Sequence, residues 1–218
     1  MQKVKCVVSD ICGENGYVVW KDGSSECVII DPGFSTDRFL EFLAEENLTQ
    51  VAAILCTHGH ADHVGGILGL RKAFPDVPIV IGKKDADKLT DSKKNLAHHF
   101  GIHLVLPHAD VKIAEAESEL EYAGMRLKVW QTPGHSAGHV IYALQPEEDG
   151  GQLLVFCGDV IFYGSIGRSD FFDGNPVTLE NSIRNVIYAL PDDSILYSGH
   201  GPATSVGQER RTNPYVMG

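Results

Sequence analysis

The chain has 218 residues, 43% of them apolar, which suits one compact domain over residues 1–218 with a single core. Its formal net charge of −11 argues against a nucleic-acid partner, because phosphate backbones are bound mainly by clustered lysine and arginine. The sequence holds no apolar run near the ~20 residues that span a bilayer, and its N-terminus lacks the apolar core of a secretory signal, so we expect a cytoplasmic protein without a membrane partner.

Three strands and a helix are predicted in the N-terminal part of the chain. The strands cover residues 3–8, 17–20 and 27–30, with a hairpin turn at residues 21–24. The third strand stops at Asp31, which is followed by Pro32 and Gly33. Thr36 is the predicted N-cap of a helix that ends near Asn47. Its apolar face carries Phe39, Leu40, Phe42 and Leu43.

A buried strand over residues 51–56 leads into the most informative stretch of the chain, in which six consecutive positions hold three histidines and an aspartate. These residues are His58, His60, Asp62 and His63. Neutral imidazole and carboxylate are ligands for zinc and similar divalent ions. The alternative is a polar loop that happens to be rich in histidine, but burying four such groups without a shared cation would be costly. The stretch therefore predicts a metal site, with its ligands in a loop because their spacing is not that of the helical His-Glu-x-x-His motif.

The pattern after this cluster predicts a helix over residues 64–74 and a strand over residues 78–81. Residues 83–106 are less regular, with a short helix over residues 86–89, and we expect a surface excursion placed where it can cover the site. Four histidines in or near the excursion lack ligand spacing and are left unassigned. They are His98, His99, His103 and His108.

The second half of the chain predicts a further set of strands and one helix. Alternating glutamates over residues 115–121 indicate a strand with one solvated acidic face. Further strands are predicted over residues 125–130, 140–144, 153–157 and 195–197, the last of the chain, with a turn at residues 147–151. Asn175 and Pro176 begin a helix that Pro191 ends. The five cysteines are expected to be reduced, buried thiols: Cys6, Cys12, Cys27, Cys56 and Cys157.

Five predicted apolar strands end at a residue that can bind a metal or carries a carboxylate. These residues are Asp31, His58 with its neighbours, His135, Asp159 and His200. Because sites in layered α/β proteins form at the carboxyl ends of strands, we expect them to meet at one edge of the core. Seven candidate ligands are too many for one tetrahedral zinc, so two metals bridged by a carboxylate such as Asp159 are the natural solution.

This succession of motifs resembles that of the metallo-β-lactamase-fold superfamily, and within it the compact glyoxalase II-like hydrolases, over nearly the whole chain. The resemblance implies an α/β protein, a four-layer αββα sandwich with the metal site at one edge of the two sheets. It also implies two ligand sets and a bridge: His58, His60 and His135; Asp62, His63 and His200; and Asp159. Asp31 would orient the cluster loop from behind. His139 has no ligand counterpart and is expected to form hydrogen bonds at the start of the next strand.

The resemblance implies a metal-dependent hydrolase with two divalent ions, zinc before iron or manganese, and with Asp62 and Asp159 as its catalytic carboxylates. Metal-bound hydroxide would attack an acyl carbonyl. A thiolate, whose parent thiol has a pKa near ~8.5, leaves with little protonation, which favours thioesters over amides. The expected partner is therefore a small-molecule acyl thiol of the S-acylglutathione type.

Arg168 is the candidate substrate-binding residue, because guanidinium matches carboxylate geometry and glyoxalase II contacts glutathione through a basic residue of the corresponding loop. An ion pair with Asp170 or Asp173 is an equally good interpretation. Glyoxalase II also carries a helical C-terminal domain that completes its glutathione pocket. This chain ends soon after His200, so we expect no such domain, and another acyl thiol remains open.

A persulfide dioxygenase is the nearest alternative, since those enzymes share the element over residues 167–171 and hold one iron. The residues that would hold it here are His58, His135 and Asp159. The segment over residues 198–202 looks more like that of the compact hydrolases and favours the hydrolase. A β-lactamase is disfavoured because the second ligand set is not of the histidine-cysteine type. A non-enzymatic metal-binding role is disfavoured because the set of seven ligands is complete.

Overall fold

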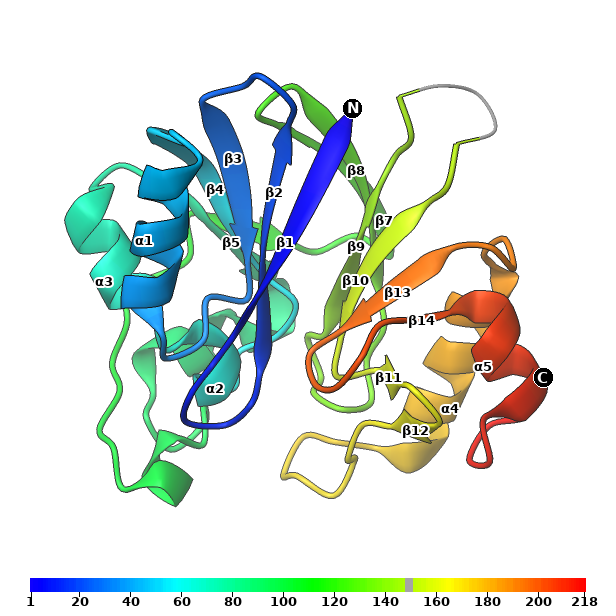
Figure 1. Ribbon diagram of the computed structural model, residues 1–218. Helices are drawn as coiled ribbons and strands as arrows, with labels where there is room; N and C mark the ends of the chain where they lie inside the picture. The colour runs from blue at the N-terminus through cyan, green and yellow to red at the C-terminus, as the bar shows by residue number, and fades with distance from the viewer. Residues whose placement is uncertain (148–150) are drawn as a thin grey trace.

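The computed structural model describes residues 1–147 and 151–218, which form two six-stranded sheets with helices on their outer faces (Figure 1). The turn predicted at residues 147–151 lies largely outside the described residues. Every helix of the described part is too short or too polar to cross a membrane.

The first sheet contains strands from the N-terminal half of the chain, in sequence order across the sheet. They are β1 (Gln2–Val8), β2 (Asn15–Lys21), β3 (Glu26–Ile30), β4 (Gln50–Cys56), β5 (Ile79–Gly82) and β6 (Val111–Ile113). Strands β3 and β4 are parallel, with Ile30 opposite Leu55. The residues that follow these strands, Asp31 and Thr57, therefore lie side by side at one edge.

The second sheet has the order β14-β13-β10-β9-β8-β7. Its strands are β7 (Glu117–Tyr122), β8 (Met125–Gln131), β9 (Val140–Leu144), β10 (Leu154–Gly158), β13 (Ile195–Ser198) and β14 (Thr204–Ser205). Strand β9 is antiparallel to β8 and β10, and β13 is parallel to β10, so β8, β10 and β13 run in one direction. Their carboxyl ends, which lead to His135, Asp159 and His200, consequently share one edge.

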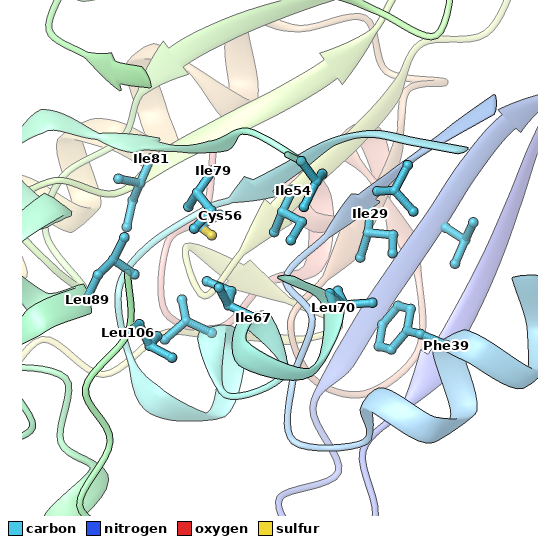
Figure 2. Packing of buried hydrophobic residues seen from close by; sticks show 14 of the residues in the cluster. Ile29, Phe39, Ile54, Cys56, Ile67, Leu70, Ile79, Ile81, Leu89 and Leu106 are labelled. Atoms are coloured by element: carbon cyan, nitrogen blue, oxygen red, sulfur yellow. The ribbon is translucent and has the colours of Figure 1, made fainter. Parts of the chain in front are cut away.

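Because successive side chains of a strand point to opposite faces of the sheet, the core is divided into layers. Val19, Val28 and Leu55 of the first sheet face Leu127 and Tyr142 of the second, and all are fully buried between the sheets. The residues between them in sequence point outward. Figure 2 shows Ile29, Ile54 and Ile79 on that outer face, packed against Phe39, Ile67 and Leu70 of the covering helices. This arrangement confirms the predicted four-layer αββα sandwich.

Helices α1 (Thr36–Glu45) and α3 (Ile67–Ala73) cover the first sheet, and α4 (Pro176–Asn185) and α5 (Val206–Thr212) lie on the second. Two details of the predicted helices were wrong. Thr36 is the first helical residue and not the cap, and its hydroxyl donates to the carbonyl of Gly66. The helix predicted over residues 64–74 is two pieces, α2 (Ala61–Val64) and α3. A Cβ atom at position 66 would lie 2.5 Å from the carbonyl oxygen of Gly33. Glycine at the break between α2 and α3 therefore lets the chain pack closely against Gly33.

Residues 83–106 are not a surface excursion, because their apolar side chains join the outer core of the first sheet. Leu89, Ala97, Leu104 and Leu106 are buried there. The segment forms two 3₁₀ helices, η1 (Lys83–Thr90) and η2 (Ala97–Phe100), instead of the one short helix predicted. The order of elements was also incomplete, because β14 and α5 follow the strand predicted to be the last.

The predictions for the acidic strand and the cysteines have different outcomes. The glutamates of β7 are exposed, as the alternation predicts. All five cysteines are free, but only Cys27, Cys56 and Cys157 are buried. Cys6 is exposed on the edge strand β1, and Cys12 is half-buried in the loop that joins β1 to β2.

Candidate metal centre

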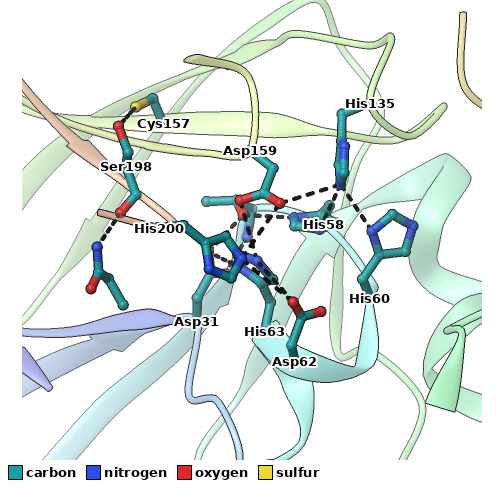
Figure 3. A network of polar contacts seen from close by, with 12 residues as sticks. Asp31, His58, His60, Asp62, His63, His135, Cys157, Asp159, Ser198 and His200 are labelled. Atoms are coloured by element: carbon teal, nitrogen blue, oxygen red, sulfur yellow. Dashed lines mark hydrogen bonds and ion pairs between the residues drawn. The ribbon is translucent and has the colours of Figure 1, made fainter. Parts of the chain in front are cut away.

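The His58 cluster begins where β4 ends, at the edge shared by both sheets (Figure 3). His58 and His60 lie in the loop after the strand, as predicted, whereas Asp62 and His63 belong to the short helix α2. His60 is the N-cap of that helix, with an extended backbone. The turn of α2 separates the cluster into two parts that face different partners from the second sheet.

The first part of the cluster meets His135, which lies between β8 and β9. The Nε2 atom of His135 lies 3.2 Å from Nε2 of His58 and 2.9 Å from Nδ1 of His60. All three rings are buried. Neighbouring nitrogens around one tetrahedral zinc, at Zn–N distances of about 2.0–2.1 Å, would be roughly 3.3 Å apart. The three nitrogens are therefore spaced as ligands of a common cation.

The second part of the cluster meets His200, which follows β13. The Nε2 atom of His200 lies 3.5 Å from Oδ2 of Asp62, and Nε2 of His63 lies 3.9 Å from the same oxygen. These three side chains form a second group whose ligand atoms are all within 4.8 Å of one another. Imidazole and carboxylate together suit a divalent cation.

The carboxylate of Asp159 lies between the two groups. One oxygen, Oδ1, is 3.4 Å from Nε2 of His63, and the other, Oδ2, is 3.6 Å from Nε2 of His135 and 3.8 Å from Nε2 of His200. Nε2 of His63 and Oδ1 of Asp159 are buried and lack a hydrogen-bond partner in the described part of the chain. Such groups are costly to bury unsatisfied, and cations in the two groups would satisfy both atoms. The donor set thus fits two metal ions.

The charge states of these residues favour cation binding. Burial lowers the pKa of His58, His60 and His135, which keeps their imidazoles in the neutral, ligating form. Burial alone would raise the pKa of Asp159, but the neighbouring histidines, His63 first, hold it well below the usual range for a carboxyl group. Burial opposes a charge on His63 as well, yet Asp159 and Asp62 raise its pKa well above the usual value. A cation bound by His63 must therefore displace a proton.

Asp31, the residue predicted to orient the cluster loop, contacts Thr57 and His63. Its carboxylate accepts hydrogen bonds from the Thr57 amide at 2.7 Å and the Thr57 hydroxyl at 2.6 Å, and its Oδ2 lies 3.0 Å from Nδ1 of His63. With Nδ1 of His63 bound to Asp31, Nε2 is left to face Asp62 and Asp159. Asp31 itself has φ of 47°, a left-handed conformation that the surrounding hydrogen bonds maintain.

His139 is a hydrogen-bonding residue, as expected, and it contacts the backbone of Asp159. Its Nε2 accepts a hydrogen bond from the Asp159 amide at 3.2 Å, and its Nδ1 lies 3.0 Å from the Thr132 hydroxyl. Its ring is stacked on that of His58 with centroids 5.1 Å apart. Burial lowers the pKa of His139 and keeps the ring neutral.

Arg168 contributes to the centre through its backbone. Its carbonyl oxygen lies 2.8 Å from Nδ1 of His135, so this ring donates at Nδ1 and presents Nε2 to the other histidines. The guanidinium of Arg168 forms two hydrogen bonds of 2.9 Å with Asp170 and lies over the ring of Phe171. Of the two interpretations of this side chain, the ion pair with Asp170 is therefore present, whereas Asp173 pairs with another residue, Lys88.

Lys88 and Asp85 are functional candidates that the sequence analysis missed. Asp85 accepts hydrogen bonds from the amides of Gly59 and Gly138 and from the Ser136 hydroxyl, so it joins the cluster loop to the loop of His135. Lys88 is 2% exposed, and its Nζ lies 3.1 Å from Asp85 and 2.8 Å from Asp173. Two charged residues in an irregular polar stretch give no sequence signal that separates them from surface residues.

A cavity of about 380 Å³ opens above the candidate ligands. Its floor is polar: His60, Asp62, His135, Asp159 and His200. Its wall comes from residues 96–100 on one side and residues 162–171 on the other. The segment that follows η1 therefore borders the site, as the sequence analysis allowed, although it is part of the core.

Residues 10–200 match the family model of the metallo-beta-lactamase superfamily. The chain is 35% identical to a probable metallo-hydrolase, YqgX, of Bacillus subtilis, with 94% of the chain and 92% of that protein covered. It is also 35% identical to the hydroxyacylglutathione hydrolase GloC of Haemophilus influenzae, with 93% of the chain and 92% of that protein covered.

Solved structures give the same family likeness. The B3 metallo-beta-lactamase BLEG-1 superposes with a TM-score of 0.91 at 35% identity, covering 99% of this chain and 100% of that one. TTHA1623, in a di-iron-bound form, gives a TM-score of 0.80 at 32% identity over 97% of this chain and 100% of that one. ETHE1 from Myxococcus xanthus gives 0.77 at 26% identity over 97% of this chain and 83% of that one.

Proposed function

The chain belongs to the metallo-beta-lactamase superfamily, and from that premise we propose that it is a hydrolase that uses two divalent metal ions, zinc first, to cleave thioesters of the S-acylglutathione type. The observation that carries the proposal is the position of Asp159, whose carboxylate lies 3.6 Å from His135 of one group of candidate ligands and 3.4 Å from His63 of the other, on the floor of one cavity. The di-iron form of TTHA1623 supports a pair of metals, and the name of GloC supports the acyl-thiol substrate. We place all of this in one domain, residues 1–218.

The proposed ligands follow the geometry. The first metal would be held by His58, His60 and His135, the second by Asp62, His63 and His200, with Asp159 between them. When bound, the two cations would supply an activated water and positive charge for a developing oxyanion. Asp62 and Asp159, which line the cavity and have lowered pKa values, can accept hydrogen bonds from water as carboxylates. The thiolate leaving group needs no acid from the chain.

The test is metal analysis of the isolated protein combined with a thioester hydrolysis assay. We expect close to two equivalents of metal per chain, loss of hydrolysis on chelation, and its return when zinc is added back. Because the BLEG-1 structure is described as a beta-lactamase, the assay includes a β-lactam substrate in parallel. Hydrolysis of the β-lactam with none of the thioester would contradict the proposal.

A persulfide dioxygenase is the second candidate, and one feature of the site favours it. Nε2 of His135 lies 3.2 Å from His58 and 3.6 Å from Asp159, so two histidines and a carboxylate could hold a single iron. The likeness to ETHE1 supports it equally. Oxygen uptake with glutathione persulfide by protein loaded with one iron, with no thioester hydrolysis, would establish this activity in place of the hydrolase.

A further inference from the structure

We propose that the cavity selects thioesters with an apolar acyl group and does not need the charges of glutathione. The inference rests on the proposed thioester hydrolysis and changes its substrate class from the S-acylglutathione type to thioesters with an apolar acyl group, whatever the thiol. Two independent features support it: the rings that flank the candidate ligands, and the pairing of the cations beside them.

The wall of the cavity is apolar where it meets the candidate ligands. The ring of Phe171 lies 5.0 Å from that of His60 and 5.6 Å from that of His135, on the first group. The ring of Phe162 lies 6.0 Å from that of His200, on the second group. A carbonyl that reacts between the groups would therefore have apolar surface on both sides.

The outer wall extends this apolar surface. Leu96 and Phe100 line the cavity from the side of the first sheet, and Ile166 lines it from the side of the second. Phe100 is 41% exposed and its ring packs edge-on against that of Phe34, which holds it in place at the rim. An exposed aromatic ring at a cavity mouth can gain burial when a ligand covers it.

The cations near the cavity are already paired. Arg168 is the one lysine or arginine among the described residues that line it, and two hydrogen bonds join its guanidinium to Asp170. Lys88 is buried and lies between Asp85 and Asp173. His99 is the other basic group of the wall, and its ring packs on His98. Glutathione has two carboxylates, and one that binds Arg168 here would have to compete with Asp170 for this exposed guanidinium.

The test is a series of N-acetylcysteamine thioesters, whose thiol is neutral, with acetyl, butanoyl, hexanoyl and octanoyl groups, and S-lactoylglutathione for comparison. Each buried methylene should raise kcat/KM by roughly threefold to fourfold until the cavity is filled. We expect the hexanoyl thioester to exceed both the acetyl thioester and S-lactoylglutathione by at least about tenfold. A flat series, or S-lactoylglutathione as the best substrate, would overturn the inference while leaving the proposed function intact. If protein with two metals cleaves none of the thioesters, the proposed function itself fails.

Two substitutions and one control variant sharpen the test. Phe100→Ser should lower kcat/KM for the hexanoyl thioester about tenfold and reduce the dependence on chain length, whereas Tyr215→Ser, at a ring that is 64% exposed and does not line the cavity, should change neither. Asp170→Asn releases the Arg168 guanidinium and should raise the ratio of kcat/KM for S-lactoylglutathione to that for the hexanoyl thioester severalfold. An unchanged chain-length dependence in Phe100→Ser would show that the acyl chain does not lie against this wall, which would contradict the proposal.

Discussion

The floor and the wall of the cavity are built by different means. Every candidate ligand of the floor follows a strand or starts the short helix after one, so the sheets fix its position through backbone hydrogen bonds. The wall consists of residues 96–100, which include η2, and residues 162–171, which overlap the short hairpin of β11 (Ile161–Phe162) and β12 (Ser165–Ile166), so neither part belongs to the two large sheets. Substitutions in the wall can therefore change which substrates bind while the candidate metal ligands of the floor stay the same.

The substitution Asp159→Asn should have the largest effect on activity. The amide keeps the shape of the side chain but removes the charge that faces both groups of ligands, so kcat/KM for a thioester should fall at least ~1000-fold, with fewer than two metals bound per chain. Activity assays and metal analysis of the same sample measure both. Asp193→Asn, at an exposed carboxylate, is the matched control. Full activity in Asp159→Asn would indicate that metal binding serves a non-enzymatic role.

Lys88→Met tests the link between floor and wall. Removing this buried cation leaves Asp85 and Asp173 without their shared partner, and loss of one member of such a pair typically costs about 3 kcal/mol of unfolding free energy. Urea unfolding monitored by circular dichroism measures the change, with Lys72→Met at an exposed position as the control. In the double variant with Asp173→Asn the two losses should not add, because the residues share one interaction. A loss no greater than that of the control would show that the network adds nothing to stability.

The substitution Asp31→Asn should lower metal affinity although Asp31 is not itself a proposed ligand. The amide cannot accept hydrogen bonds at both of its terminal atoms, so the position of His63 is no longer held, and metal affinity should fall about 10-fold to 100-fold. Competition with a coloured chelator gives the affinity, and Asp37→Asn, which is exposed, controls for the change of charge. Equal affinities for the two variants would exclude an orienting role for Asp31.

The floor could be predicted from the sequence and most of the wall could not. Asp159 and His200 follow apolar runs, and parallel strands bring such positions to one edge, so their convergence follows from general rules of sheets. The segment over residues 83–106 has no regular period, and its burial depends on Leu89, in η1, and on Leu106, in the chain after η2, both of which reach the core. The burial of Lys88 depends on Asp173, far away in sequence, and no local pattern indicates a partner of that kind.

The pH dependence of metal binding separates the two groups of the floor. Burial keeps His58, His60 and His135 neutral, so protons compete little for the first group. In the second group the carboxylates raise the pKa of His63, so at any pH below that raised value a cation must displace a proton, and its affinity should increase about tenfold per pH unit. Zinc titrations at several pH values from 6 to 8 should therefore show one binding step whose affinity is nearly constant and a second whose affinity increases with pH. If both binding steps had the same pH dependence, the two groups of ligands would titrate as one coupled site, contrary to this prediction.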